Sequence, residues 1–234
     1  MKKYEEENAF ALSIGDLMAA LLLIFVLLLS STLLRLEKET EEKVNIAEKY
    51  VEIKRELYNN LFLEFKEDLP KWGAEIDSLT LSFMFHTPDI LFKQGDYKLS
   101  NKFQEILTDF FPRYINVLSE QKFRDAIEEI RIEGHTSSEW SFQVEEDKAY
   151  FYNMELSQNR TRAVLEFSLL QIDEKDLKDW CRGKITANGL SSSKLVFENG
   201  IENKAVSRRV EFRVRTDAEK RIDELLKLSL KNND

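Results

Sequence analysis

One acidic side chain, Asp16, lies inside an otherwise apolar N-terminal segment. It is the only ionisable residue between Phe10 and Leu34, and Leu17 to Leu29 is an unbroken apolar run. A carboxylate at the centre of a membrane-spanning helix costs about 2.5–3.5 kcal/mol, so it is expected to face a protein partner, line a wet cavity or carry an ion. Asp16 is therefore a candidate ion-conducting residue. The alternative is an acid close enough to the membrane surface to be hydrated, with no function.

Residues suited to enzymatic chemistry are few. The chain has two histidines and one cysteine, and they suggest no nucleophile–base pair and no cluster of metal ligands. Glu133 near His135 is too common a pattern to count, and His135 is interpreted as a loop histidine satisfied by its neighbours. Cys181 cannot form an intramolecular disulfide; we expect a buried thiol, the alternative being a disulfide between two copies. The sequence therefore predicts no enzyme, no cofactor and no metal site.

Charge and composition limit the kinds of partner that the chain can bind and the way its domains can be arranged. The formal net charge is −9, which argues against broad nucleic-acid binding because such binding depends on clustered Lys and Arg. Seven Gly and three Pro among 234 residues argue against long flexible linkers. The length leaves room for one globular domain of ordinary size after the membrane segment.

The apolar segment is predicted to be a transmembrane helix over 10–34, after a short tail, 1–9. About 25 residues span about 30 Å of hydrocarbon with some tilt. Ser30, Ser31 and Thr32 give no clear cleavage site, so we expect an uncleaved anchor and not a signal peptide. Two lysines precede the span and four basic residues follow it (Arg35, Lys38, Lys43 and Lys49). The flanking charges alone therefore favour a C-terminal domain on the cytoplasmic side.

A helical stalk is expected over 35–73. Apolar side chains recur there in steps of three and four residues, with no Gly or Pro before Pro70. The pattern favours pairing with a second copy of the chain; the alternative is a helix packed on its own domain. The apolar positions are Leu33, Leu36, Val44, Ala47, Val51, Tyr58, Leu61 and Phe65.

Strands and helices alternate over 74–216 and predict a small mixed sheet with helices on one face, an α/β sandwich. Strands are expected near 79–85, 127–133, 184–187 and 210–214. Helices are expected over 99–118, bent or broken at Pro112, and over 157–170, with Ser157 as the N-cap. A closing amphipathic helix is expected over 217–234.

Three stretches in this region resemble the OmpA/MotB C-terminal peptidoglycan-binding family. They are Ile132-Glu133-Gly134-His135-Thr136, Tyr152-Asn153-Met154-Glu155-Leu156-Ser157-Gln158-Asn159-Arg160, and Ser207-Arg208-Arg209-Val210-Glu211-Phe212. The resemblance covers about residues 76–216. It implies an OmpA-like domain that binds peptidoglycan through Tyr152, Asn153, Leu156, Arg160, Thr136 and Ser137.

The chemistry of these residues agrees with such a ligand, because peptidoglycan peptides present carboxylates and amides. Arg160 offers a planar fork to a carboxylate, and Asn153 can donate and accept at once. If the helix began at Ser157, its free N–H groups would add donors beside Arg160. The alternative for Arg160 is a surface salt bridge. Ser137 replaces the family's acid, so recognition of the peptide amino group is in doubt, and the aromatic segment 138–151 would compensate or cover the site.

The N-terminal half extends the resemblance. Ser13-Ile14-Gly15-Asp16-Leu17-Met18-Ala19 resembles the helix of MotB-like stator subunits, and the whole chain looks most similar to the MotB-like subunits of the Zorya anti-phage system. This implies a homodimer inside a ring of five MotA-like (ZorA-like) subunits, with Asp16 carrying protons, less readily sodium. It also implies a single pass through the bacterial inner membrane, a cytoplasmic N-terminus and a periplasmic C-terminal domain that binds peptidoglycan.

Other classes stay open at this point. A flagellar MotB-type stator would have the same plan, and a passive OmpA-like wall anchor would have no ion flow. An ExbD/TolR-type energy transducer shares an N-terminal helix with an aspartate, but the motif from Asn153 to Arg160 argues against it.

Overall fold

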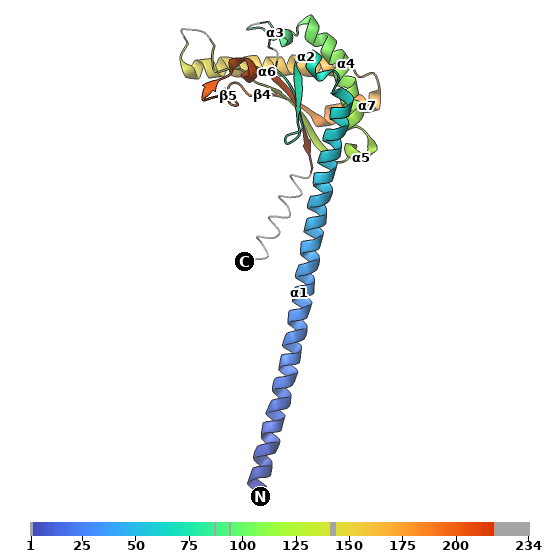
Figure 1. The fold of residues 1–234 in the computed structure, drawn as a ribbon, viewed down its shortest axis with the longest axis vertical. Helices are drawn as coiled ribbons and strands as arrows, with labels where there is room; N and C mark the ends of the chain where they lie inside the picture. Colours follow the sequence, from blue (N-terminus) through green and yellow to red (C-terminus); the bar gives the residue numbers. More distant parts are fainter. Residues whose placement is uncertain (1, 87, 94, 141–143, 218–234) are drawn as a thin grey trace. The chain divides into compact units, whose positions relative to one another are not determined.

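The computed structural model describes residues 2–86, 88–93, 95–140 and 144–217 (Figure 1). The chain divides into two compact units, Met1–Lys49 and Tyr50–Asp234, and each is described by itself. Apart from Asp217, the predicted C-terminal helix over 217–234 lies outside the described residues.

The N-terminal unit is helical throughout and belongs to α1 (Lys2–Phe65). Residues Ile14–Glu41 are long and apolar enough to cross a membrane by length and composition, and none of this window is buried within the protein. The large side chains from Leu17 to Leu29 are exposed, as expected of a helix whose apolar surface is covered by something other than its own chain.

The last turns of α1 belong to the C-terminal unit and carry part of its core. Leu57, Leu61 and Phe65 are buried and recur every four residues on one face of the helix. For these turns the structure shows the alternative arrangement, a helix packed on its own domain. Leu36, Val44 and Val51 are exposed, and their pairing with a second copy stays a prediction.

An ion-pair network and a short helix end this segment. Arg113 pairs with Glu64 (Nε to Oε1, 2.7 Å) and with Asp68 (Nη1 to Oδ2, 3.1 Å). The short helix α2 (Leu69–Trp72) then leads to Gly73, which is left-handed at φ 59°, a conformation that favours glycine.

The centre of the domain is a five-stranded mixed sheet in the order β1-β2-β7-β3-β4. The strands are β1 (Ala74–Asp77), β2 (Ser82–Phe85), β3 (Ile127–Gly134), β4 (Ile185–Gly189) and β7 (Val210–Thr216). Only β3 and β4 are parallel; the other neighbours are antiparallel. Two short strands, β5 (Phe197–Glu198) and β6 (Ile201–Glu202), pair separately.

Helices supply the second layer of the sandwich (Figure 1). The long ones are α4 (Asn101–Leu118), α6 (Glu146–Leu170) and α7 (Lys175–Lys184), and the single-turn ones are α3 (Pro88–Leu91), α5 (Gln121–Arg124) and α8 (Lys204–Ser207). Phe110 of α4 lies at the centre of the aromatic core, with its ring centroid 4.5 Å from that of Phe83 and 5.1 Å from that of Phe212.

The sequence-based outline of the fold is confirmed, with several corrections. The strand expected over 79–85 begins only at Ser82, because Leu79 and Leu81 lie in a turn, and α7 was not predicted. Helix α4 runs through Pro112 without a break, so of the two forms expected there the broken one is wrong. Helix α6 begins at Glu146, not at Ser157, so Ser157 is a buried residue inside the helix and not an N-cap. Strand β1 was not predicted, because an edge strand of four residues gives little alternation to detect.

The burial of Leu61 leads to a test of where the domain begins. Replacing Leu61 by Ala should lower the free energy of unfolding by about 2–5 kcal/mol, because it leaves a cavity in a close-packed core. Leu63→Ala is the matched control, since Leu63 is exposed two residues further on. Thermal unfolding of the purified full-length chain in detergent measures both, and equal small effects would show that this turn is not part of the core.

Candidate functional site

Helix α6 lies directly against the C-terminal ends of the parallel strands β3 and β4. Gly134 and Gly189 end these strands and are register partners. A Cβ on Gly134 would stand 2.7 Å from Thr161 Cγ2, and one on Gly189 would stand 2.4 Å from the Gln158 backbone nitrogen. Glycine at both positions therefore allows a helix–sheet approach that any side chain would block.

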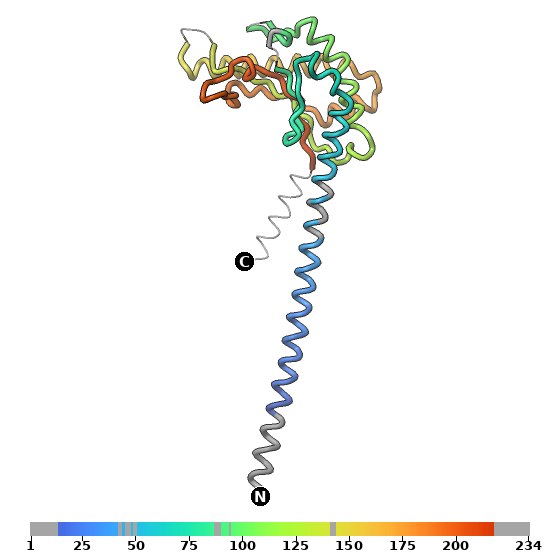
Figure 2. The backbone as a smooth tube through the Cα atoms, viewed as in Figure 1, coloured from blue at the N-terminus to red at the C-terminus, as the bar shows by residue number. Residues whose placement is uncertain are grey.

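The same helix fixes the chain that leaves β4. Ser157 Oγ accepts from the Ser191 backbone N–H at 3.1 Å, and Gln158 Oε1 accepts from that of Gly189 at 2.7 Å. Ser191 Oγ donates to the Tyr150 carbonyl at 2.7 Å. Figure 2 shows the result, with the segment between β4 and β7, in orange, lying beside the start of α6, in yellow.

The loop after β3 brings three predicted site residues together. Asn153 is buried, and its Nδ2 donates to the carbonyls of Ser137 at 3.2 Å and Glu139 at 3.5 Å. Thr136 donates its backbone N–H to the Ser191 carbonyl at 2.9 Å. The side chains of Thr136 and Ser137 are themselves buried. These residues shape the loop in this structure, and the buried Asn153 amide is one of the groups that fix it, together with Glu202, which accepts from the Ser138 backbone N–H at 3.0 Å.

Tyr152, Leu156 and Arg160 lie on another face of α6, because a spacing of four residues keeps side chains in one row. Tyr152 is exposed and Leu156 is half-buried. The Tyr152 ring packs on Trp140 with centroids 5.3 Å apart. Phe142, also expected in this aromatic segment, lies outside the described residues.

Arg160 is a half-buried cation without an ion-pair partner among the described residues. Its Nε donates to the Asp96 carbonyl at 2.9 Å and its Nη2 to the Lys93 carbonyl at 3.3 Å. Its guanidinium carbon lies 4.7 Å from the centre of the Phe92 ring. No carboxylate among the described residues forms an ion pair with it, so the predicted alternative of a surface salt bridge is not seen there.

A second guanidinium raises the positive potential at Arg160. Burial first, and the nearby charge of Arg208 second, lower the pKa of Arg160 to about 10. Arg208 itself has a buried Nε that hydrogen-bonds to none of the described residues. Carbonyl partners orient Arg160, and the nearby Asp96 carboxylate offsets its charge only in part, without forming an ion pair. Two such cations suit a carboxylate ligand. Because Arg160 lies well inside α6, the expected help from a helix N-terminus is wrong.

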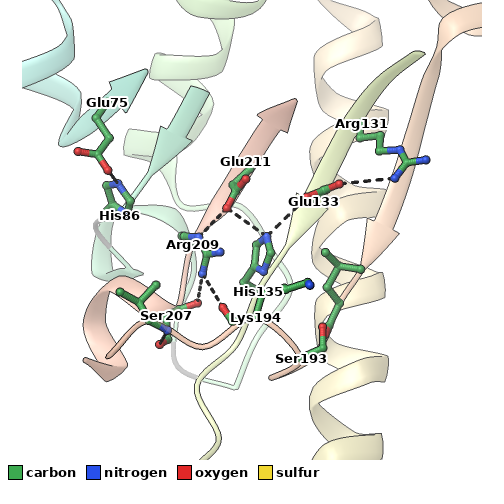
Figure 3. Close-up of polar contacts among 12 residues, drawn as sticks. Glu75, His86, Arg131, Glu133, His135, Ser193, Lys194, Ser207, Arg209 and Glu211 are labelled. Carbon is green, nitrogen blue, oxygen red and sulfur yellow. Dashed lines mark hydrogen bonds and ion pairs between the residues drawn. The ribbon is translucent and has the colours of Figure 1, made fainter. Parts of the chain in front are cut away.

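A buried polar cluster near the same loop was missed by sequence reasoning (Figure 3). Antiparallel pairing places Glu133 of β3 opposite Glu211 of β7, with His135 beside both. Arg209 Nε donates to Glu211 Oε1 at 2.7 Å. The alternation of charges along the two strands, Glu129-Arg131-Glu133 and Glu211-Arg213-Arg215, was the available signal for a polar face of the sheet.

The electrostatics of this cluster are set mainly by burial. Desolvation, helped by the charges of Arg209 and Lys194, lowers the pKa of His135 to about 3. Its ring is therefore neutral at ordinary pH, and its approaches to the carboxylates are polar contacts and not ion pairs. Burial first, and then Glu211, raises the pKa of Glu133. The expectation that His135 is satisfied by its neighbours is wrong, because neither ring nitrogen hydrogen-bonds to a described residue.

The two remaining predicted features are simple to place. Asp16 is exposed on α1, in the N-terminal unit, and none of the described residues pairs with it. Cys181 is a buried free thiol, as expected.

The position of Asn153 generates a prediction about the loop. Asn153→Ala should lower the free energy of unfolding by about 1–3 kcal/mol, because it leaves the Ser137 and Glu139 carbonyls without their donor. Asn159→Ala in the same helix is the control, since none of the described hydrogen bonds uses its side chain. Chemical denaturation measures both, and equal losses would contradict a specific role for the Asn153 amide.

Comparison with known proteins places the chain in a family. No family model matches it. The Zorya protein ZorB of Escherichia coli is 40% identical over 232 residues, which cover 97% of this chain and 96% of that protein. A crystal structure of a MotB-like protein from Desulfovibrio vulgaris superposes with a TM-score of 0.52 at 23% identity, covering 72% of this chain and 98% of that one.

The structural likeness concerns the fold alone. The periplasmic domain of Helicobacter pylori MotB also matches, at 16% identity and a TM-score of 0.44, over 67% of this chain and 90% of that one. The sequence identity over nearly the full length of both chains decides the family. The chain belongs to the ZorB family, and its C-terminal domain has the MotB/OmpA-like fold.

Proposed function

We propose that this chain is the peptidoglycan-anchored subunit of a proton-driven, stator-type motor that acts in anti-phage defence. The observation that carries the proposal is the 40% identity to the Escherichia coli Zorya protein ZorB, which extends through the apolar helix and the folded domain. The chain would cross the bacterial inner membrane once, with its N-terminus in the cytoplasm and its C-terminal domain in the periplasm. Two copies would lie inside a ring of MotA-like (ZorA-like) subunits, five to each dimer.

Asp16 is the proposed proton carrier. Its neighbours Leu17, Met18 and Leu21 are exposed apolar side chains, which suits a helix surrounded by lipid and by other helices. One helix cannot enclose a path for ions, so the partner subunits must supply its other walls. Moving one charge through a membrane potential of 100 mV releases about 2.3 kcal/mol, which is the energy available for rotation.

The anchoring site is proposed on the exposed face of α6. Arg160 and Arg208 would bind a carboxylate of the peptidoglycan stem peptide, and Tyr152 and Leu156 would border it. Asn153, Thr136 and Ser137 would hold the adjoining loop in place, because their side chains are buried. Ser137 stands where the family has an acid, so we propose that binding here depends more on the cationic pair than on recognition of an amino group.

Replacing Asp16 by Asn tests the carrier. The variant should fold and co-purify with its MotA-like partner, because the two side chains have nearly the same shape, but it should no longer protect cells from phage. Plaque counts on cells that express the complete defence system measure protection.

Asp16→Glu is the matched control, since it keeps an acid at the same position. The Glu variant should retain more protection than the Asn variant. Full protection by the Asn variant would exclude a proton-carrying role and favour a passive wall anchor instead.

Replacing Arg160 by Ala tests the anchor. Loss of a charge-assisted hydrogen bond worth about 1.5–3 kcal/mol should weaken binding to purified peptidoglycan about tenfold or more. Co-sedimentation of the purified chain with peptidoglycan sacculi measures this.

Arg162→Ala is the control in the same helix, because the Arg162 side chain is exposed and pairs only with Glu166, at 2.9 Å, among the described residues. Arg160→Lys separates charge from shape, and intermediate binding is expected because Lys lacks the planar fork. Unchanged sedimentation of a folded Arg160→Ala variant would contradict the anchoring role.

A further inference from the structure

Two carboxylates lie directly opposite each other in the sheet and are almost fully buried. Glu133 and Glu211 are cross-strand partners in β3 and β7, and they are only 6% and 7% exposed. Like charges directly opposite in a sheet are destabilising, and burial increases the cost of each unpaired charge. The pair therefore needs a compensating positive charge or protons.

Arg209 and Arg131, with a further contribution from Arg213 through its charge alone, supply only part of this compensation. Arg209 bonds Glu211 through Oε1 alone, and its Nη1 donates to the carbonyls of Lys194 and Ser207, each at 3.2 Å. Arg131 Nη1 lies 4.0 Å from Glu133 Oε1, beyond hydrogen-bond distance. Each glutamate thus keeps an oxygen atom that neither arginine bonds.

His135 points into the space between the two carboxylates (Figure 3). Its side chain is 2% exposed, and its Nε2 lies 3.4 Å from Glu211 Oε1 and 3.9 Å from Glu133 Oε2. Neither ring nitrogen hydrogen-bonds to a described residue. Buried polar side chains without partners are rare in folded proteins, and a bound ion is one of the few causes that produce them.

We propose that Glu133, His135 and Glu211 bind a divalent transition-metal ion, with Zn²⁺ as the best match. One nitrogen and two carboxylate oxygens lie within 4.8 Å of one another. In a tetrahedral zinc site, metal–ligand distances of about 2.0–2.2 Å place neighbouring ligand atoms roughly 3.3–3.6 Å apart. The 3.4 Å distance between His135 Nε2 and Glu211 Oε1 already lies in this range. The 3.9 Å distance between His135 Nε2 and Glu133 Oε2 reaches it by a small rotation of the Glu133 side chain. Three protein ligands leave the fourth position to water.

The surroundings of the cluster suit a metal site. A carboxylate ligand is commonly hydrogen-bonded by a second side chain that orients it, and Arg209 has this position at Glu211. Arg131, Arg209, Arg213 and Lys194 are the cations around the site, and the two carboxylates offset part of their repulsion toward a bound ion.

Metal binding here would fix the loop that starts at His135. The ion would join the end of β3, the following loop and the start of β7, adding to the hydrogen bond from the His135 backbone N–H to the Arg209 carbonyl at 3.0 Å. Thr136 and Ser137 directly follow His135 in the chain, and the Asn153 side chain donates a hydrogen bond to the Ser137 carbonyl. This metal site does not depend on the proposed motor function.

The test is direct metal binding to the purified full-length chain in detergent, prepared without a histidine tag. The protein is stripped with a chelator, dialysed against micromolar Zn²⁺ and analysed by mass spectrometry for zinc per chain. We expect about one zinc per chain and a higher thermal unfolding midpoint with zinc than without it. Co²⁺ should give the visible absorption of a site with nitrogen and oxygen ligands. Thiolate bands should be missing, because Cys181 is not among the three proposed ligands.

Two variants locate the site. His135→Gln should bind zinc at least tenfold more weakly and lose the zinc-dependent rise in unfolding midpoint. His86→Gln is the matched control, because His86 is the other histidine and contacts Glu75, outside the cluster, at 2.7 Å; its zinc content should equal that of the wild type. Wild-type protein that retains no zinc, or equal zinc in the wild type and in His135→Gln, would overturn the proposal. The wild-type measurement decides even if His135→Gln fails to fold.

Discussion

The close approach between α6 and the ends of β3 and β4 is the constraint on which the rest of the domain depends. It exists because Gly134 and Gly189 are paired in register and have no side chains to separate helix from sheet. The approach fixes the direction of α6, and with it the buried row that includes Asn153 and the partly exposed row that ends at Arg160. A methyl group at either glycine would collide with atoms of α6, so one small change at the strand ends would displace the whole candidate site.

Two neighbouring parts of the domain hold largely buried charged groups of opposite sign. Arg160 is held by the carbonyls of Lys93 and Asp96, which orient a cation without neutralising it. The cluster of Glu133, His135 and Glu211 is the opposite case, with acids concentrated under a covering loop and a neutral imidazole among them. The first arrangement is the one proposed to bind an anion, and the second is the one proposed to bind a cation. Both are positioned by the segments that enter and leave the same pair of strands.

Much of this organisation could be predicted from the sequence because it follows from simple periodicities. The apolar run around Asp16 predicts a long apolar helix, and the alternation of Val210, Phe212 and Val214 predicts a strand. The start of α6 could not be predicted, since its first turns carry the exposed aromatics Tyr150, Phe151 and Tyr152, which hide the helical period. The role of Asn153 also needed the structure, because the carbonyls that it holds come from a distant segment.

The acidic cluster was harder to predict from the sequence than the fold was. Glu133 and Glu211 come together only through the register of two antiparallel strands, and nothing in their local sequence marks that register. Arg160 was predicted from a motif. The role of Arg208 beside it needed the structure, which shows that the Arg208 charge lowers the pKa of Arg160 and that the buried Arg208 Nε hydrogen-bonds to none of the described residues.

The central claim is that this chain carries protons through the membrane together with its ring partners. Cytoplasmic pH, recorded with a fluorescent reporter in cells that express the complete system, tests it most directly during phage infection. We predict an acidification that begins with infection and disappears when the carboxyl group at residue 16 is removed. A cytoplasmic pH that stays constant while the cells remain protected would contradict the claim.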